Sequence, residues 1–379
     1  MPAAETSTLD QLIAEVKEAE ASERNLARIR TTATPRLSVE IENPIAWVIL
    51  FGYDPQRYFA DPLFNLQQNL RQALWRFRNI EDDVPIGSWV PAWLGHYVEY
   101  SFYGLKLSVR EHGGPELQTD HPLTRDPDLG LLPELDFSTP EGFRTPGWMP
   151  RMLEWYERLV ELAAGRLDIG FFAWNRGGLD IAMQLRGFEA LLVDTRERPE
   201  FVHGLLGRLT ADRCAWFSAA ARYLGQPLGP TWVADDWLAA PYVSPAIFRY
   251  FVLPRYLEIE AHHGVFAGFH SCGDQAPFHA DMLHIKTLGS YEVSPWMSLA
   301  QALANLPPDK HLHLGAHPND VVVDSPAQMR DKLQAQADLI KGSGRGYSVG
   351  TSGLTPIQPE AEFVQRVNQW LDIAREVFG

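Results

Sequence analysis

Short apolar runs alternate with helical patterns from residue 165 onward, and this alternation constrains the fold more than any other feature. Each run is followed within a few residues by Gly, Pro, Asp or Asn, as β-strands commonly are. The runs cover residues 168–174, 231–236, 265–272, 287–293, 311–317 and 346–350. Helical patterns cover residues 244–263, 326–341 and 359–378. Strands that alternate with helices indicate βαβ units and a parallel sheet.

An open doubly wound sheet and a closed eight-fold barrel both fit this alternation. The open sheet usually carries a Gly-rich phosphate loop after its first strand, and the sequence contains none. Polar residues instead end strand after strand: Asn175, Asp235, Asp236, His270, Cys272, Glu292, His317, Thr351 and Ser352. Because a barrel gathers its strand ends at one mouth, we expect a (β/α)8 TIM barrel over residues 41–379. Residues 1–40 are expected to form an N-terminal helical extension, with its helix at residues 8–30.

The end of one predicted strand carries half of a zinc site. His270 and Cys272 are two positions apart, so their side chains point to the same face of the strand. Glu292 ends the next strand and supplies a third plausible ligand. The fourth position is left to one of several neighbours: Ser352, Thr351, His317 or water.

Charge and cysteine content narrow the class of protein. The formal net charge of −15 at pH 7, without any Lys/Arg block, argues against a nucleic-acid partner. With only Cys214 and Cys272, a disulfide framework is not expected, which fits a reducing compartment. No segment approaches about 18 consecutive apolar residues, and no basic start precedes an apolar block. We therefore expect a cytoplasmic protein without a membrane span.

Several motifs follow one another in a specific order between residues 45 and 379. They are Phe51-Gly52-Tyr53, Tyr58-Phe59-Ala60-Asp61-Pro62, Asp82-Asp83-Val84-Pro85, Arg186-Gly187 with Arg198-Pro199-Glu200, Ala234-Asp235-Asp236-Trp237, Ser244-Pro245, Val252-Leu253-Pro254-Arg255-Tyr256 and His270-Ser271-Cys272-Gly273. In this order they resemble the uroporphyrinogen decarboxylase superfamily, which agrees with a β/α barrel. The last motif resembles the branch of zinc-dependent methyltransferases that move methyl groups between corrinoids and thiols.

The resemblance implies a metal-dependent methyltransferase. In that branch, as in the more distant cobalamin-independent methionine synthase barrel, a His, a Cys, often a Glu and a later Cys hold zinc. His270, Cys272 and Glu292 match the first three, but residues 350–353 contain no cysteine where the later one is expected. Ser352 is the first candidate to replace it, and Thr351, His317 or water remain alternatives. A hydroxyl or water in place of a thiolate weakens zinc binding and leaves the more open position that suits catalysis.

The resemblance also implies the reaction partners. Either a small methylated compound is demethylated onto a corrinoid protein, or a methyl group passes from a corrinoid protein to a thiol. The chain lacks the Asp-x-His-x-x-Gly signature of corrinoid-binding domains, so the corrinoid would come on a separate protein.

Further polar and aromatic residues at the strand ends are candidates for catalysis and substrate binding. Asp235 and Asp236 are candidate general acids or bases, and only one of two neighbours on a strand is expected to enter the mouth. The candidates for substrate binding are Asn175, Arg176, Trp174 and Trp237, with Trp296 also near a strand end. Two alternatives remain open: a cofactor-free decarboxylase or other lyase that uses these carboxylates with Arg176, and a non-catalytic binder of tetrapyrroles or corrinoids.

Overall fold

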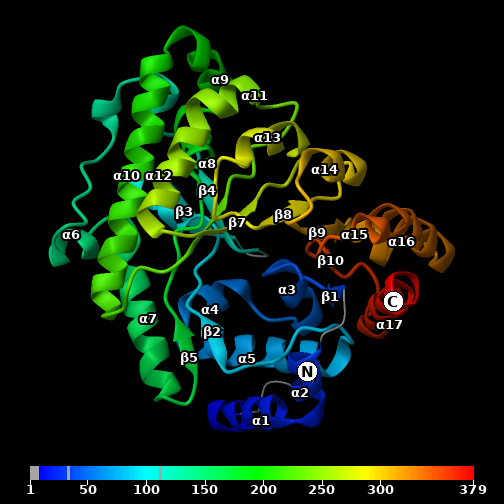
Figure 1. The fold of residues 1–379 in the computed structure, drawn as a ribbon. Helices are drawn as coiled ribbons and strands as arrows, with labels where there is room; N and C mark the ends of the chain where they lie inside the picture. Colours follow the sequence, from blue (N-terminus) through cyan, green and yellow to red (C-terminus); the bar gives the residue numbers. More distant parts are fainter. Residues whose placement is uncertain (1–7, 32–34, 111–112) are drawn as a thin grey trace.

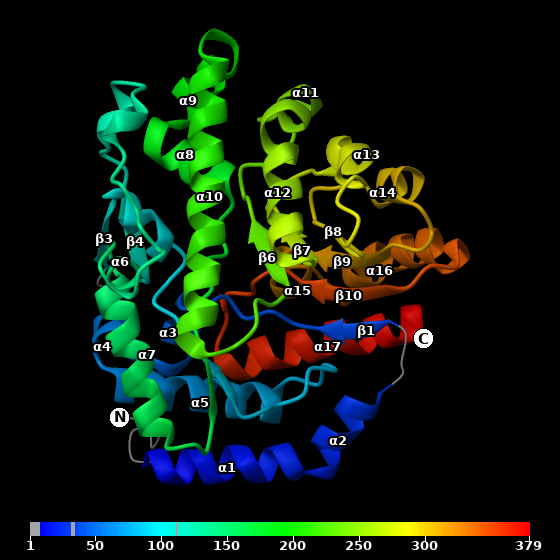
Figure 2. The same ribbon diagram turned by 60° about the vertical axis from the view of Figure 1, so that its left-hand side comes forward.

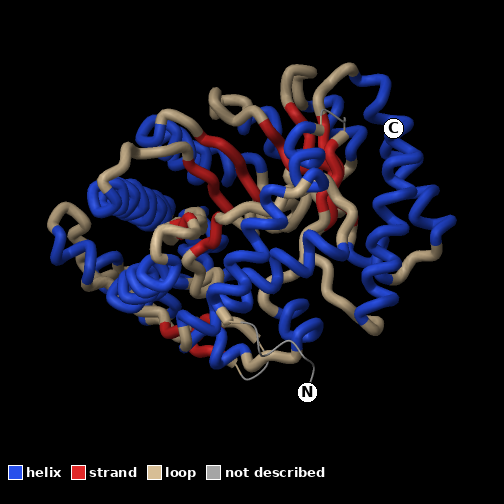
Figure 3. Tube along the Cα trace, turned by 90° about the horizontal axis from the view of Figure 1, so that it is seen from below, coloured by secondary structure: helices blue, strands red, loops and turns tan. Residues whose placement is uncertain are grey.

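Short parallel strands lie toward the inside of the molecule, and helices lie around them (Figures 1 and 3). The computed structural model describes residues 8–31, 35–110 and 113–379. The parallel strands are β1 Arg36–Ser38, β2 Trp89–Pro91, β5 Asp168–Gly170, β6 Thr231–Ala234, β7 Phe266–His270, β8 Ser290–Val293, β9 His311–Ala316 and β10 Tyr347–Thr351. The six from β5 to β10 lie at the apolar runs predicted from the sequence.

Hydrogen bonding divides these strands among three parallel sheets. One sheet has the order β1-β10-β9-β8, so the first strand lies beside the last, while β6 pairs with β7 and β2 with β5. A bridge between Arg176 and Ala234 connects the segment after β5 to β6. Within the described residues the sheets do not join into one closed ring, and the fold is mixed α/β with parallel sheets. A separate antiparallel pair consists of β3 Lys106–Val109 and β4 Pro115–Gln118.

The register of β6 and β7 brings their ends together. Ala234 lies opposite His270, and Asp235 N–H donates to His270 O at 3.0 Å, which continues the pairing by one residue. Because the two strands are parallel, the residues that follow them leave the sheet at the same end, next to each other. This register therefore brings Asp236 and Cys272 close together.

Helices connect the strands and cover them. Their bounds are α1 Leu9–Ala21, α2 Glu23–Arg30, α3 Ile45–Phe51, α4 Pro55–Ala60, α5 Pro62–Asn79, α6 Pro140–Arg144, α7 Met149–Ala163, α8 Gly178–Arg186, α9 Phe188–Glu197, α10 Pro199–Leu224, α11 Pro245–Ile247, α12 Leu253–His263, α13 His279–Met282, α14 Leu299–Asn305, α15 Pro318–Val322, α16 Pro326–Ile340 and α17 Glu360–Phe378. A π-helical turn, Phe248–Val252, joins α11 to α12, and 3-10 turns lie at Val98–Tyr103, Pro122–Thr124, Leu129–Leu131, Ala276–Phe278 and Lys341–Ser343.

The C-terminal helix shows how apolar periodicity holds a helix against its neighbours, here α15 and α16. In α17 the buried side chains recur every three or four residues, at Phe363, Val367, Trp370, Ala374 and Val377. This spacing places them on one face of an α-helix. Each large apolar side chain that becomes fully buried contributes about 1.5–3 kcal/mol, so this face anchors the helix.

The N-terminal region departs from the expectation of a single helix. Residues 8–30 form α1 and α2, because Ser22 ends the first helix and its side chain accepts a hydrogen bond from Asn25 N–H at the start of the second. Figure 2 shows α1 lying below α5 at one end of the molecule. Strand β1 falls within the expected extension of residues 1–40, but it pairs with β10 and so belongs to a parallel sheet. The domain division at residue 40 stays a prediction. No helix in the described ranges is long and apolar enough to span a membrane.

Candidate metal centre

Residues that follow the strands line a cavity of about 760 Å³. Its polar lining includes Glu40, Glu42, Asn175, Arg176, Asp236, His270, Cys272, Glu292, Thr351 and Ser352. They come from segments far apart in sequence, so the parallel strands bring them to one place, as expected where strand ends meet.

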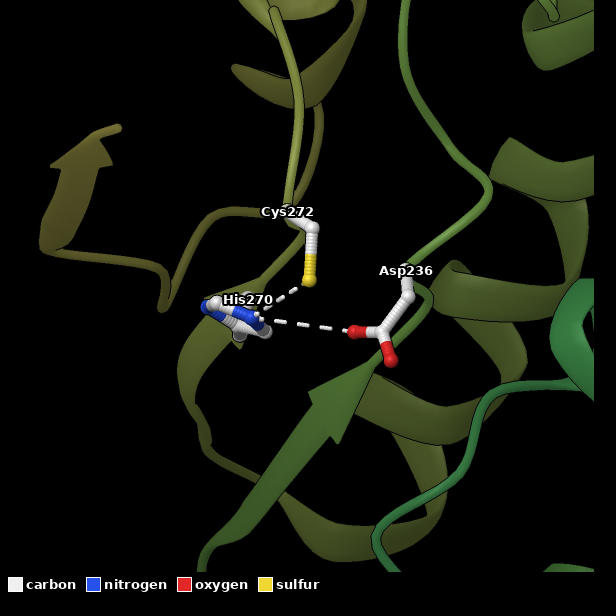
Figure 4. A group of neighbouring side chains, drawn as sticks. All are labelled: Asp236, His270 and Cys272. Atoms are coloured by element: carbon white, nitrogen blue, oxygen red, sulfur yellow. Dashed lines mark hydrogen bonds and ion pairs between the residues drawn. The ribbon is translucent and has the colours of Figure 1, made fainter. Parts of the chain in front are cut away.

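Asp236, His270 and Cys272 place three possible metal ligands side by side (Figure 4). His270 Nε2 lies 3.5 Å from Cys272 Sγ and 3.6 Å from Asp236 Oδ1, and all three donor atoms lie within 4.8 Å of one another. Ligands at zinc distances of about 2.0–2.3 Å in a tetrahedron are roughly 3.3–3.8 Å apart. The two pairs that include His270 already have this spacing, so the donor set fits zinc.

Glu292 contacts the other nitrogen of the same imidazole. Its Oε2 lies 2.6 Å from His270 Nδ1. Burial disfavours the charged imidazole, but hydrogen bonds with Cys272 and Glu292 outweigh burial and raise the pKa of His270 to about 10. Carboxylates commonly bind the free nitrogen of a metal-ligating His and fix its orientation. In this arrangement Glu292 lies at Nδ1, on the far side of the ring from Cys272, while Asp236 lies near Nε2.

Arg176 fixes the second oxygen of Asp236. Its guanidinium makes a short ion pair with Asp236 Oδ2 and a 2.8 Å ion pair with Asp180 Oδ2. Its Nε donates to His96 O at 3.2 Å. The Arg176 side chain is only 11% exposed, so little of it remains for a substrate anion. Arg176 lines the cavity, and its contacts support Asp236.

Asp235 is fully buried and faces away from Asp236. Its oxygens accept hydrogen bonds from Tyr256 OH at 2.5 Å and from Asp180 N–H at 2.7 Å, at the start of α8. Burial and the neighbouring Asp180 raise the pKa of Asp235. A Cβ on Gly177 would lie 2.0 Å from Asp235 Oδ2. The absence of a side chain at Gly177 therefore lets the Asp235 carboxylate, rather than a substrate anion, pack against the backbone here. Of the two candidate catalytic carboxylates, only Asp236 lines the cavity.

Some of the remaining predicted site residues line the cavity, and the others lie outside it. Asn175, Thr351 and Ser352 line the cavity. Trp174 is buried, with its ring 5.3 Å from the Phe102 ring, and Trp237 contacts Phe188 at 5.1 Å between ring centroids. His317 caps α15 by accepting a hydrogen bond from Asn319 N–H. His317, Trp174 and Trp237 are not among the described residues that line the cavity.

Several cavity residues were not predicted. Glu40 and Glu42 follow the short strand β1, and both carboxylates line the cavity together with the rings of His96 and His313. Burial and then the neighbouring Glu42 raise the pKa of Glu40, while burial raises the pKa of Glu42. Strand β1 has three residues, too few for a periodic pattern, so no sequence signal pointed to the glutamates after it.

Comparison with known proteins gives a similarity of fold. No known family model matches the chain, and no curated protein matches its sequence. Among solved structures, the chain is similar to a methyltransferase from Methanosarcina mazei, with a TM-score of 0.63 and 16% sequence identity. The similarity covers 94% of this chain and 98% of that one. At this identity the similarity establishes that the two chains share a fold over nearly their whole length.

Proposed function

We propose that the parallel strands form a (β/α)8 barrel of the uroporphyrinogen decarboxylase type. The strands β1, β2, β5, β6, β7, β8, β9 and β10 match the number that such a barrel requires. The pairing of the first strand with the last supports closure, as does the bridge between the segment after β5 and β6. The shared fold with a methyltransferase is consistent with this proposal.

We further propose that the protein is a zinc-dependent methyltransferase. The observation that carries the proposal is the donor set of Asp236, His270 and Cys272, which lines a large cavity and in which both pairs that include His270 have tetrahedral spacing. Bound zinc would supply a Lewis acid that lowers the pKa of a coordinated thiol or water. With three protein ligands, one position is left for that group, and Ser352 lies in the same cavity.

The residues of the chain divide into ligands and positioning groups. Asp236 Oδ1, His270 Nε2 and Cys272 Sγ would hold the ion. Glu292 orients the imidazole through Nδ1, and Arg176 orients Asp236 through Oδ2. Because both partners are charged, each favours the ligand geometry already present in the protein alone.

The partners in this proposal are a small methylated compound or a thiol, and a corrinoid carried by a separate protein. A decarboxylase that anchors a substrate carboxylate on Arg176 is not favoured, since this guanidinium is shared by Asp180 and Asp236. A binder without catalysis would not need a thiolate and an imidazole at metal-ligand spacing.

Metal analysis combined with a transfer assay tests the proposal. The wild-type protein should bind one equivalent of zinc, and Cys272→Ser should lose most of it. Cys214→Ser is the matched control, because Cys214 is the other free cysteine and lies outside the cavity. Zinc-loaded protein should also catalyse methyl exchange between cobalamin and thiols or small methylated donors, measured by cobalamin absorbance. Failure to bind zinc, or equal activity of wild type and Cys272→Ser, would reject the proposal.

A further inference from the structure

Exposed tryptophans line the same cavity as the metal ligands. Trp89, Trp232 and Trp296 are 60%, 42% and 56% exposed, and all three lie on the cavity wall. Large aromatic side chains are ordinarily mostly buried, so three exposed indoles around one cavity indicate a surface that a ligand covers.

Two of these indoles rest against glycines on neighbouring strands. A Cβ on Gly268 would lie 2.5 Å from the Trp232 ring, and one on Gly170 would lie 2.7 Å from the Trp89 ring. Trp232 also lies nearly parallel to the His270 ring, with an angle of 18° and 6.1 Å between centroids. The backbone therefore holds these rings in place, and one of them is directly beside the candidate ligand His270.

The charge of the cavity wall is mostly negative. Glu40, Glu42, Asp236 and Glu292 contribute carboxylates, whereas Arg176 is the only Lys or Arg side chain among the described residues of the wall. That guanidinium already pairs with two aspartates. The carboxylates of Glu40 and Glu42 make no hydrogen bond or ion pair within the described part of the chain, so they remain available to a ligand.

Aromatic faces combined with unpaired carboxylates recognise a particular class of ligand. A quaternary ammonium group cannot donate hydrogen bonds, and it is attracted both by ring faces and by nearby negative charge. A neutral ether would gain nothing from the carboxylates, and an anion would be repelled by them.

We propose that the methyl donor is a quaternary ammonium compound, bound through its cationic head between these tryptophans and Glu40 and Glu42. This inference rests on the proposed methyl transfer. In the transfer, the bond from nitrogen to the methyl carbon breaks and its electron pair stays on nitrogen, which leaves a neutral tertiary amine. The methyl carbon forms its new bond with the electron pair of a thiolate or of a reduced corrinoid, cob(I)alamin. A cavity of about 760 Å³ has room for a trimethylammonium compound and part of such an acceptor.

A pair of isosteric probes tests the recognition without any transfer step. Choline and its neutral analogue 3,3-dimethyl-1-butanol differ by nitrogen in place of the quaternary carbon and by one positive charge. Titration of intrinsic tryptophan fluorescence in zinc-loaded and metal-free wild type should give at least about tenfold tighter binding of choline. Equal affinity for both probes, or no saturable binding of choline at millimolar concentrations, would overturn the proposal.

Variants locate the binding site. Trp232→Leu and Glu42→Gln should each weaken choline binding by about five- to tenfold and change binding of the alcohol less. Trp237→Leu is the matched control, since this tryptophan lies outside the cavity wall. If Trp237→Leu weakens choline binding as much as Trp232→Leu does, the cation binds elsewhere and the proposal fails.

The transfer assay separates this inference from the proposed function. Cob(I)alamin is offered choline or the neutral ether 2-methoxyphenol, and methylcobalamin formation is measured. Methyl transfer from the ether alone would support the proposed function and overturn the ammonium donor. Selective binding of choline without transfer from either donor would support the cation site and count against the proposed function.

Discussion

Removing the charge of Glu292 tests whether this residue orients His270 or itself binds the metal. Glu292 Oε2 lies 2.6 Å from His270 Nδ1, and its side chain is 20% exposed. A hydrogen bond to a charged group contributes about 1.5–3 kcal/mol, against about 0.5–1.5 kcal/mol for a neutral one. Glu292→Gln retains an acceptor oxygen and loses the charge, so zinc should bind roughly tenfold more weakly. Glu292→Leu removes the bond altogether and should weaken binding on the order of 100-fold.

The assay is a competition titration of zinc against a chromophoric chelator at fixed pH. Cobalt(II) in place of zinc gives a second signal, because a thiolate ligand produces a sulfur-to-cobalt charge-transfer band. Glu292→Gln should retain this band with a weaker dissociation constant, whereas Cys272→Ser should lose it.

Two further variants complete the comparison. Asp236→Asn removes the charge of the proposed third ligand and should weaken zinc binding more than Glu292→Gln does. Glu42→Gln removes a charge from the same cavity without touching the donor atoms, and should change zinc affinity only a few-fold. If Glu292→Gln abolishes zinc binding while Asp236→Asn leaves it near the wild-type value, Glu292 is the ligand and the reasoning is wrong.

Three further predictions concern the surroundings of the site. Tyr256→Phe leaves the buried Asp235 without its 2.5 Å hydrogen bond and should lower the free energy of unfolding by about 1–3 kcal/mol in urea titrations, with zinc affinity unchanged. In Gly268→Ala the new methyl group would lie 2.5 Å from the Trp232 ring, so the ring must move. This variant should therefore shift tryptophan emission and weaken choline binding. Gly289→Ala, which meets open space, should do neither. Burial lowers the pKa of His279 from 6.5 to about 4. Below pH 6.5 the unfolded chain therefore takes up a proton that the folded chain does not, so the free energy of unfolding decreases as the pH falls from 6.5 to 4. His279→Phe should remove about 3 kcal/mol of that acid-induced loss, and identical pH profiles of wild type and variant would contradict this reasoning.

The strands that could be predicted are those bounded by clear turn residues. The strands from β5 to β10 were found because apolar runs stand between Gly, Pro, Asp and Asn. β1 and β2 have three residues each, and the first residue of each, Arg36 and Trp89, is exposed. Their place in the fold is set by pairing with β10 and β5, which are distant in sequence, so no local pattern could reveal them.

The candidate site was predictable where spacing determines direction. His270 and Cys272 are two apart on β7 and its end, and the structure places their donor atoms 3.5 Å apart. Spacing cannot say which imidazole nitrogen a carboxylate will meet. That choice depends on side-chain rotamers and on the order of strands, and it places Asp236 by Nε2 and Glu292 by Nδ1.

The adjacent carboxylates of Asp235 and Asp236 show how the core sets the geometry of the site. Strand alternation sends them in opposite directions, Asp235 into the core and Asp236 into the cavity. They are linked again through the protein, because Arg176 pairs with Asp236 and Asp180, and Asp180 N–H donates to Asp235. A rotation of Asp236 away from His270 would therefore leave a buried guanidinium short of one partner, which is costly in a low-dielectric interior. The same buried groups that surround the start of α8 thus hold the Asp236 carboxylate in place beside His270. This explains why Arg176 lies in the cavity wall and yet pairs with two aspartates of the protein itself.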